Sequence, residues 1–426
     1  MPHHCTAVPA YDVVGVGAGP ANLSLAALLQ EHSDRSIALF DAAQAPRWHD
    51  ALLHPGARMQ TSWLKDLVSF VDPTHRLSFL NYLVGEGRLF ALMNAQFDFI
   101  PRGEFQRYLA WASARIAGVR YDTPVDEVDY VEGEGFVTVS RGRAVARSQH
   151  LVLGVGTRSA LPDVFAALPP DRALLADQLG TRLATVTADL DAPVAVVGGG
   201  QTGIEAVFRL RAAGHRRILW IGRRQWFQTI DDSPTANDFY RPAHQRFLQD
   251  LTRSTRRRLV EEQEVTGDAL TPNVLRTLYQ LNYDGLLELD RFPITLLPGR
   301  DVVTTRMDGD DVVLSCATAE RLEEHRVRHA VIACGREYRP LPLSENLRDR
   351  LETDDDGELL IDSDYSVPFK GADGNRVYAV NRARYSHGVP DANLTLMPVR
   401  SAIIVNSIEE RQVFAVSDEL CPIAWG

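Results

Sequence analysis

Lysine is nearly absent from this sequence, and the shortage makes the remaining lysines informative. Only Lys65 and Lys370 occur among the 426 residues, so almost all of the 45 basic side chains are arginine. A genome rich in arginine codons would produce this bias. Lysine and arginine are nevertheless not interchangeable at a functional site, because an ammonium is a compact charge and a guanidinium is a planar group with several donors. A lysine retained inside a motif is therefore a candidate functional residue.

Cysteine is also scarce, and its positions lack the spacing of a metal or redox site. The four cysteines are Cys5, Cys316, Cys334 and Cys421, and no two of them are close together in the sequence. This distribution argues against a zinc site, a redox-active pair and a disulfide framework.

Long apolar runs are missing as well. No stretch reaches about 18 apolar residues, and the segment before Tyr11 is short and polar, so the sequence predicts neither a transmembrane helix nor a signal peptide. We therefore expect a cytoplasmic protein with no membrane partner. The net charge of −11 argues against nucleic acid as a partner. At about 150 residues per domain, the length predicts two or three domains, and a homo-oligomer stays open.

Two segments share one pattern, in which an apolar β-branched run enters a glycine-rich turn and a helical pattern follows. They span residues 11–29 and 194–213. Each is typical of the strand, turn and helix that begin a βαβ unit for dinucleotide binding. The sequence therefore predicts an α/β fold with two Rossmann-like dinucleotide-binding domains.

The first turn has the residues that a pyrophosphate site requires. Gly15 permits the turn, Gly17 lets the backbone approach the phosphates, and Pro20 takes the third position of the fingerprint. Asp41 ends the next apolar run, where an acid would bind ribose hydroxyls. An ordinary glycine turn is the alternative, and the strand, helix and acid together weigh against it.

The second turn, Gly198-x-Gly200-x-x-Gly203, is the complete fingerprint, but its second strand ends in Arg223 and Arg224 instead of an acid. Arginines at this position suit the 2′-phosphate of NADPH, and a solvated basic pair is the alternative. Two such sites in one chain indicate hydride transfer from a nicotinamide to a flavin. Disulfide reductases share this layout but need a cysteine pair, so oxygen or a soluble acceptor is the expected oxidant.

Short motifs extend along nearly the whole chain beyond these turns. The most specific is Met59-Gln-Thr-Ser-Trp-Leu-Lys-Asp-Leu-Val68. The others lie at 47–49, 73–74, 78–83, 102–111, 198–203, 233–237, 387–388 and 394–401. Together they resemble the flavin-dependent N-hydroxylating monooxygenases that act on lysine, ornithine or diamines.

The resemblance implies FAD and NADPH as cofactors, with O2 and a small aliphatic primary amine as substrates. The product would be a hydroxylamine for a hydroxamate siderophore. L-Lysine is the favoured substrate because the stretch 59–83 looks most like lysine N6-hydroxylases, and cadaverine or putrescine and then L-ornithine are the alternatives. Two readings from other classes stay open, an NADPH-dependent flavin reductase without oxygenation and a non-catalytic nucleotide-sensing protein.

On the cofactor side, the resemblance implies that Gln60 lies against the reactive edge of the flavin ring. Trp48 and His49 would help to seat the flavin. The chain departs from the family at residues 333–336, where it has Ala-Cys-Gly-Arg and many members have Ala-Thr-Gly-Tyr.

On the substrate side, the resemblance implies that Lys65 and Asn237 hold the end of the substrate remote from the reacting amine. These two residues and Gln60 form the expected catalytic set, and Asn282 would approach substrate and nicotinamide. On spacing alone, the apolar residues of 59–68 also fit one face of a helix, with Lys65 and Asp66 on its solvated side. Asp66 is expected to be a capping or ion-pairing group and not a base. His387 taken alone fits a structural histidine.

The simplest domain organisation inserts the NADPH-binding domain into the FAD-binding domain. The expected FAD-binding domain comprises residues 1–165 and 339–426, and the NADPH-binding domain comprises 166–231 and 291–338. Residues 232–290 are helix-rich and would form a small substrate-side lobe.

Overall fold

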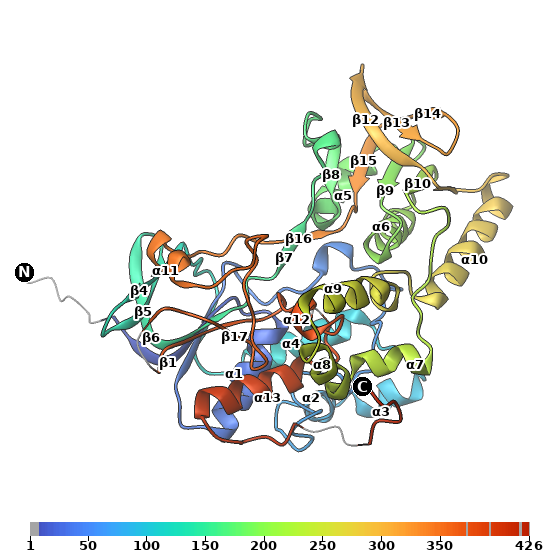
Figure 1. The fold of residues 1–426 in the computed structure, drawn as a ribbon. Coiled ribbons are helices and arrows are strands. Elements are labelled where there is room, and N and C mark those ends of the chain that lie inside the picture. Colours follow the sequence, from blue (N-terminus) through green and yellow to red (C-terminus); the bar gives the residue numbers. More distant parts are fainter. Residues whose placement is uncertain (1–7, 372–373, 392, 417–419, 426) are drawn as a thin grey trace, which may run out of the picture.

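The structure is a computed structural model that describes residues 8–371, 374–391, 393–416 and 420–425. Cys5 lies outside the described residues. Two separate sheets organise the chain, a larger mixed sheet at the left of Figure 1 and a smaller parallel sheet at the upper right. The part of the chain that is described contains no helix both long and apolar enough to cross a membrane.

The larger sheet is built around the first glycine turn. Its strands lie in the order β17-β18-β6-β1-β2-β3, and the hairpin of β4 and β5 extends from β6. β1 pairs in parallel with β2 and β6, and β6 pairs in parallel with β18. The bounds are β1 Ala10–Val16, β2 Ile37–Phe40, β3 Val119–Arg120, β4 Glu127–Val131, β5 Gly135–Ser140, β6 Arg143–Leu153, β17 Ser366–Val367 and β18 Arg376–Ala379.

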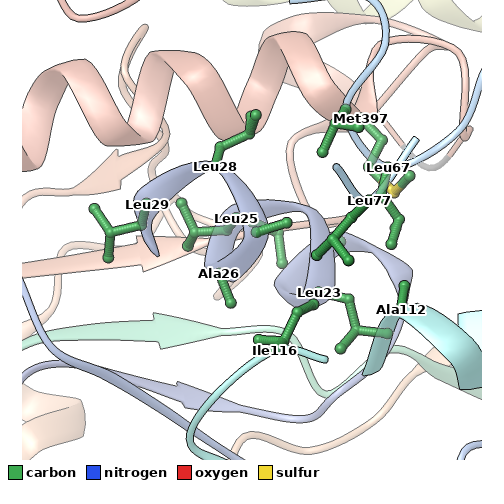
Figure 2. Packing of buried hydrophobic residues seen from close by; sticks show 14 of the residues in the cluster. Leu23, Leu25, Ala26, Leu28, Leu29, Leu67, Leu77, Ala112, Ile116 and Met397 are labelled. Atoms are coloured by element: carbon green, nitrogen blue, oxygen red, sulfur yellow. The ribbon is translucent and has the colours of Figure 1, made fainter. Parts of the chain in front are cut away.

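Helices from both ends of the chain cover one face of this sheet. α1 (Pro20–His32) packs beside α13 (Met397–Glu409), and α4 (Arg102–Ser113) belongs to the same apolar core. Figure 2 shows Leu25, Leu28 and Met397 in this core. β2 is buried along its whole length, as expected for a parallel strand that is covered on both faces. The other face packs on the β4–β5 hairpin and α11 (Glu345–Arg350).

The smaller sheet contains the second glycine turn and is parallel throughout. Its strand order is β11-β10-β9-β15-β8. α5 and α6 contribute to the core on one side, and the antiparallel meander β12–β14 packs on the other. The bounds are β8 Ala173–Leu175, β9 Val194–Val197, β10 Ile218–Gly222, β11 Ile294–Pro298, β12 Asp301–Asp308, β13 Asp311–Ala317, β14 Leu322–Val327, β15 His329–Ile332, α5 Leu179–Val186 and α6 Gln201–Ala212.

The chain passes between the two sheets twice, and the two crossings lie side by side. β7 (Thr157–Ser159) leaves the larger sheet and β16 (Arg336–Tyr338) returns to it, and the two strands pair with each other. The smaller sheet is thus inserted within the larger unit. The predicted α/β class with two Rossmann-like domains is confirmed, while the predicted domain boundaries stay a prediction.

Further helices lie between and beside the two sheets. α8 and α9 pack on α12, so the helix-rich segment contacts a C-terminal element of the larger unit. α10 behaves differently, because its Leu278 joins the core of the smaller sheet. The remaining bounds are α2 Phe79–Gly85, α3 Leu89–Asn94, α7 Pro234–Asn237, α8 Pro242–Gln249, α9 Arg253–Glu262, α10 Pro272–Leu289 and α12 Arg384–His387, with 3-10 turns at Asp50–Leu52, Asp163–Phe165, Ala176–Gln178, Asp238–Tyr240 and Glu264–Thr266.

The helical interpretation of residues 59–68 is wrong. These residues form consecutive turns and contain no helix. Asp66 explains the difference, since its buried carboxylate accepts hydrogen bonds from the backbone N–H groups of Val68, Ser69 and Phe79. The expectation that Asp66 is a capping group is confirmed, because it satisfies donors that a helix would otherwise satisfy internally.

Candidate cofactor and substrate sites

The first glycine turn is shaped to accept an anion. Gly17 has φ +97°, and a Cβ there would collide with the carbonyl oxygen of Gly154. α1 then begins at Pro20, and its N-cap Gly19 supplies no side chain to the first N–H groups. A Cβ on Gly15 would meet the side chain of Leu39. The free N–H groups and the positive end of the helix dipole therefore fit a pyrophosphate.

Asp41 is tied to this turn by its own carboxylate. One oxygen accepts from the backbone N–H of Ala18 at 2.7 Å, and the other accepts from that of Ala43 at 2.7 Å. The acid thus lies at the end of β2 beside the turn, as its predicted place requires. Its contact with a ribose stays a prediction.

A small pocket lies between the turn and Trp48, one of the two predicted flavin-seating residues. Trp48 lines it together with Ala18 and Pro20 of the turn and with Tyr121. The Trp48 ring also packs on Phe105, with 5.4 Å between ring centroids. The neighbouring His49 has a left-handed backbone at φ 52° and precedes the 3-10 turn at 50–52. Trp48 therefore adjoins the first turn, and the roles of both residues toward a flavin stay predictions.

The second glycine turn repeats this design. Gly198 has φ +130°, and a Cβ there would collide with the carbonyl oxygen of Ala333. A Cβ on Gly203 would collide with the carbonyl oxygen of Gly198, so close packing between helix and strand requires glycine. Gly200 is the N-cap of α6, has open space around its Cβ position and leaves the first N–H groups without a side-chain cap. This turn also fits a pyrophosphate.

The predicted phosphate-binding arginines lie directly after β10. Arg223 and Arg224 are both exposed. Arg224 is 3.8 Å from the carboxylate of Glu264 and donates to the carbonyl oxygen of Asp268 at 3.4 Å. These contacts are long and solvent-exposed, so they hold the arginine weakly and leave it available for a phosphate.

A polar network connects the predicted flavin-side residue to the smaller sheet. Gln60 donates from Nε2 to Thr271 Oγ1 at 3.0 Å, and Thr271 Oγ1 donates to Gln201 Oε1 at 3.3 Å. Gln201 Nε2 donates to Glu205 Oε1 at 3.0 Å. Glu205 forms a bidentate ion pair with Arg102, in which Nη1 and Oε2 are 2.7 Å apart. Gln60 is thus in contact, through this network, with the helix that follows the second turn.

Four members of this network were not predicted as site residues. Arg102 and Gln201 lie inside motifs that carry the family resemblance, and this was the available signal for them. Nothing in the sequence marks Glu205 or Thr271, because the burial of a charge and the identity of its partner depend on tertiary packing.

Lys65 is a half-buried cation without an anionic partner among the described residues. No ion pair or side-chain hydrogen bond involves its ammonium within the described ranges, and burial lowers the pKa of this group. An ammonium in this position is stabilised by an anion that approaches it. Lys370, by contrast, is exposed.

Asn237 and Asn282 occupy different surroundings. Asn237 ends α7, and its Nδ2 donates to the carbonyl oxygens of Asp232 and Ser233, so its exposed Oδ1 remains available. Both polar atoms of the buried Asn282 pair with the backbone of Ile294, at 2.9 Å and 3.0 Å. Asn282 thus joins α10 to β11. The structure does not bring it together with Gln60 by any hydrogen bond in the described part, and its substrate contact stays a prediction.

His387 has the surroundings of a structural histidine. It is buried, its ring stacks on Tyr365 at 3.9 Å between centroids, and burial lowers its pKa to about 4. A neutral imidazole that packs on a buried aromatic ring contributes to the core and not to proton transfer near neutral pH.

Comparison with known proteins identifies one family over most of the chain. A family model described as L-lysine 6-monooxygenase/L-ornithine 5-monooxygenase matches residues 9–340. The L-lysine N6-monooxygenase of Escherichia coli is 29% identical over 97% of this chain and 98% of its own length. A putrescine N-hydroxylase of Acinetobacter baumannii is 27% identical over 96% of this chain and 92% of its own length.

A solved structure gives the same result for the fold. The ornithine N-hydroxylase of Kutzneria sp. 744, described with reduced FAD, NADP+ and L-ornithine, superposes with a TM-score of 0.86. The two chains are 27% identical, and the match covers 94% of this chain and 99% of the other.

Proposed function

Because this chain belongs to the L-lysine 6-monooxygenase/L-ornithine 5-monooxygenase family of flavin-dependent N-hydroxylating enzymes, we propose that it converts L-lysine to N6-hydroxylysine. FAD, NADPH and O2 would be its cofactors and co-substrate. The hydroxylamine product would enter the synthesis of a hydroxamate siderophore.

The two glycine turns divide the cofactors between the sheets. Gly15, Gly17 and Pro20 would hold FAD, and the turn from Gly198 to Gly203 would hold NADPH, with the arginines after β10 on its 2′-phosphate. When bound, FAD would accept a hydride from NADPH and activate dioxygen. The chain itself would bind and orient the reactants, and the site would have to keep water from the reacting oxygen.

Lys65, whose ammonium has no anionic partner in the described part of the chain, is the observation that supports an amino-acid substrate. The α-carboxylate of lysine would provide the anion that this half-buried ammonium lacks. Cadaverine and putrescine have a cation at the same end, which Lys65 would repel. The exposed Oδ1 of Asn237 is a suitable acceptor for the α-ammonium of an amino acid.

Lysine is preferred to ornithine for two reasons. The stretch 59–83 resembles lysine hydroxylases, and the relative named L-lysine N6-monooxygenase aligns over nearly the whole of both chains. The reacting amine must be neutral to be nucleophilic, although the pKa of a free lysine amine is about 10.4. A site that holds the amine away from carboxylates favours this neutral form.

A substrate panel tests this proposal. The holoenzyme with NADPH is given L-lysine, L-ornithine, cadaverine or putrescine, and hydroxylamine formed per NADPH consumed is measured. We expect L-lysine to give the highest kcat/KM, at least tenfold above each diamine. A higher value for a diamine would overturn the substrate assignment. NADPH oxidation without hydroxylamine from any amine would instead favour a flavin reductase.

Replacement of Arg223 and Arg224 by alanine tests the nicotinamide site. We expect the KM for NADPH to rise about tenfold or more while the KM for NADH stays unchanged and FAD remains bound. The physical reason is that hydrogen bonds between charged groups contribute about 1.5–3 kcal/mol. Arg217→Ala, at the exposed amino end of the same strand, is the control. Equal efficiency of NADPH and NADH in the parent enzyme would contradict the assignment.

A further inference from the structure

A buried ion pair joins helices of the two units, and it differs from the exposed ion pair that α6 also makes. Arg102 begins α4 in the larger unit, and Glu205 lies in α6 behind the second glycine turn. Their side chains are each only 8% exposed. Arg211 of the same helix pairs instead with Glu288, which is 65% exposed, at 3.3 Å. A charge removed from the buried pair leaves its partner uncompensated, whereas an exposed pair contributes little.

In the hydrogen bonds that link Gln60 to this pair, each side chain donates to the next one toward Glu205. A carboxylate only accepts, so Gln201 must present its NH2 group to Glu205 and its carbonyl oxygen to Thr271. The Thr271 hydroxyl donates to that oxygen and is left to accept from Gln60. The Thr271 backbone N–H also donates to Gln201 Oε1, at 3.2 Å, so Glu205 and this N–H together fix the Gln201 amide and leave the Thr271 hydroxyl to accept from Gln60.

We infer that Glu205 is a positioning residue with two linked effects. Through Arg102 it holds the NADPH-binding domain against the FAD-binding domain, and through Gln201 and Thr271 it supports the orientation in which the Gln60 carbonyl oxygen points away from Thr271. The inference rests on the proposed function in one respect, that Gln60 faces the flavin. It does not depend on which amine is the substrate.

Glu205→Gln keeps the shape of the side chain but removes the charge that pairs with Arg102 and accepts from Gln201. In the holoenzyme we expect the rate constant for flavin reduction by saturating NADPH to fall at least tenfold. The Kd for NADP+ should stay within about twofold, because the turn and its arginines are untouched. Hydrogen–deuterium exchange should accelerate at the start of α4 and α6, where the pair is lost, and the absorption spectrum of oxidised flavin should shift.

Two further variants separate the effects. Thr271→Val cuts the hydrogen bonds to Gln60 but leaves the ion pair intact, so the flavin spectrum should change without faster exchange in α4 or α6. Glu288→Gln removes the exposed pair on the same helix, and reduction rate, exchange and spectrum should equal those of the parent.

Parent-like reduction and exchange in Glu205→Gln would overturn the domain-holding effect. A parent-like spectrum in Thr271→Val would overturn the effect on Gln60. Thr271→Val still tests this effect if Glu205→Gln does not fold. Flavin reduction is measured without amine. A failure of the substrate panel with these results intact would therefore contradict the proposed function alone.

Discussion

Lys65→Ala should raise the KM for L-lysine about 30-fold or more and lower the yield of hydroxylamine per NADPH. Lys65 is a half-buried ammonium that has no anionic partner in the described ranges, and the α-carboxylate of the substrate would pair with it. Loss of one partner from such a pair costs on the order of 2–5 kcal/mol. A poorly held amine also misses the activated oxygen, so NADPH is consumed without product. Steady-state kinetics with parallel hydroxylamine and NADPH assays give both quantities.

Lys370→Ala is the matched control, because it removes the other lysine from an exposed position. Its KM and coupling should equal those of the parent. With cadaverine, Lys65→Ala should not raise the KM, since a diamine has no carboxylate to lose. Unchanged KM and coupling on every amine would mean that Lys65 is only a solvated surface residue. The assignment of the substrate site would then be wrong.

Gly17→Ala should yield a protein that is purified with less than about a tenth of the parent's FAD. The residue has φ +97°, and the added Cβ would collide with the carbonyl oxygen of Gly154, which is backbone and cannot turn aside. The left-handed conformation alone costs a non-glycine residue on the order of 1–3 kcal/mol. Any backbone shift that relieves this collision must move the turn away from the position that the pyrophosphate would occupy. Flavin absorbance per protein and thermal unfolding measure the two consequences.

Gly133→Ala separates the collision from the backbone penalty. Gly133 has φ +80° between β4 and β5, and a Cβ there meets nothing within 4 Å. This variant should lose some stability and keep its FAD. Full flavin content in Gly17→Ala would contradict the assignment of the first turn to FAD.

The parts of the fold that follow local rules could be predicted from the sequence. The two glycine turns were recognisable because close backbone approach leaves room for hydrogen alone, as the Cβ collisions at Gly17 and Gly198 show. The strands before them are continuous apolar runs, which parallel strands require. The insertion of one unit in the other followed from the order of these patterns along the chain.

The parts that depend on tertiary contacts could not be predicted. Residues 59–68 have the spacing of a helix face, yet one buried carboxylate, Asp66, holds them in turns. Asn282 was placed near the substrate by position in a loosely matching motif, and the structure uses its amide to fasten β11. Glu205 looks like any acidic residue of a helix until Arg102, about a hundred residues away, is packed against it.

The crossing strands β7 and β16 also decide the order in which the protein can be completed on the ribosome. Every strand of the inserted sheet lies between Ala173 and Ile332, so this sheet is whole well before synthesis ends. The larger sheet begins with β1 but needs β18, and its core needs α13. Domains fold as units when their segments are present. The domain that begins first is therefore the last to close, and a nascent chain must carry the apolar side of α1 uncovered until its C-terminal helix emerges.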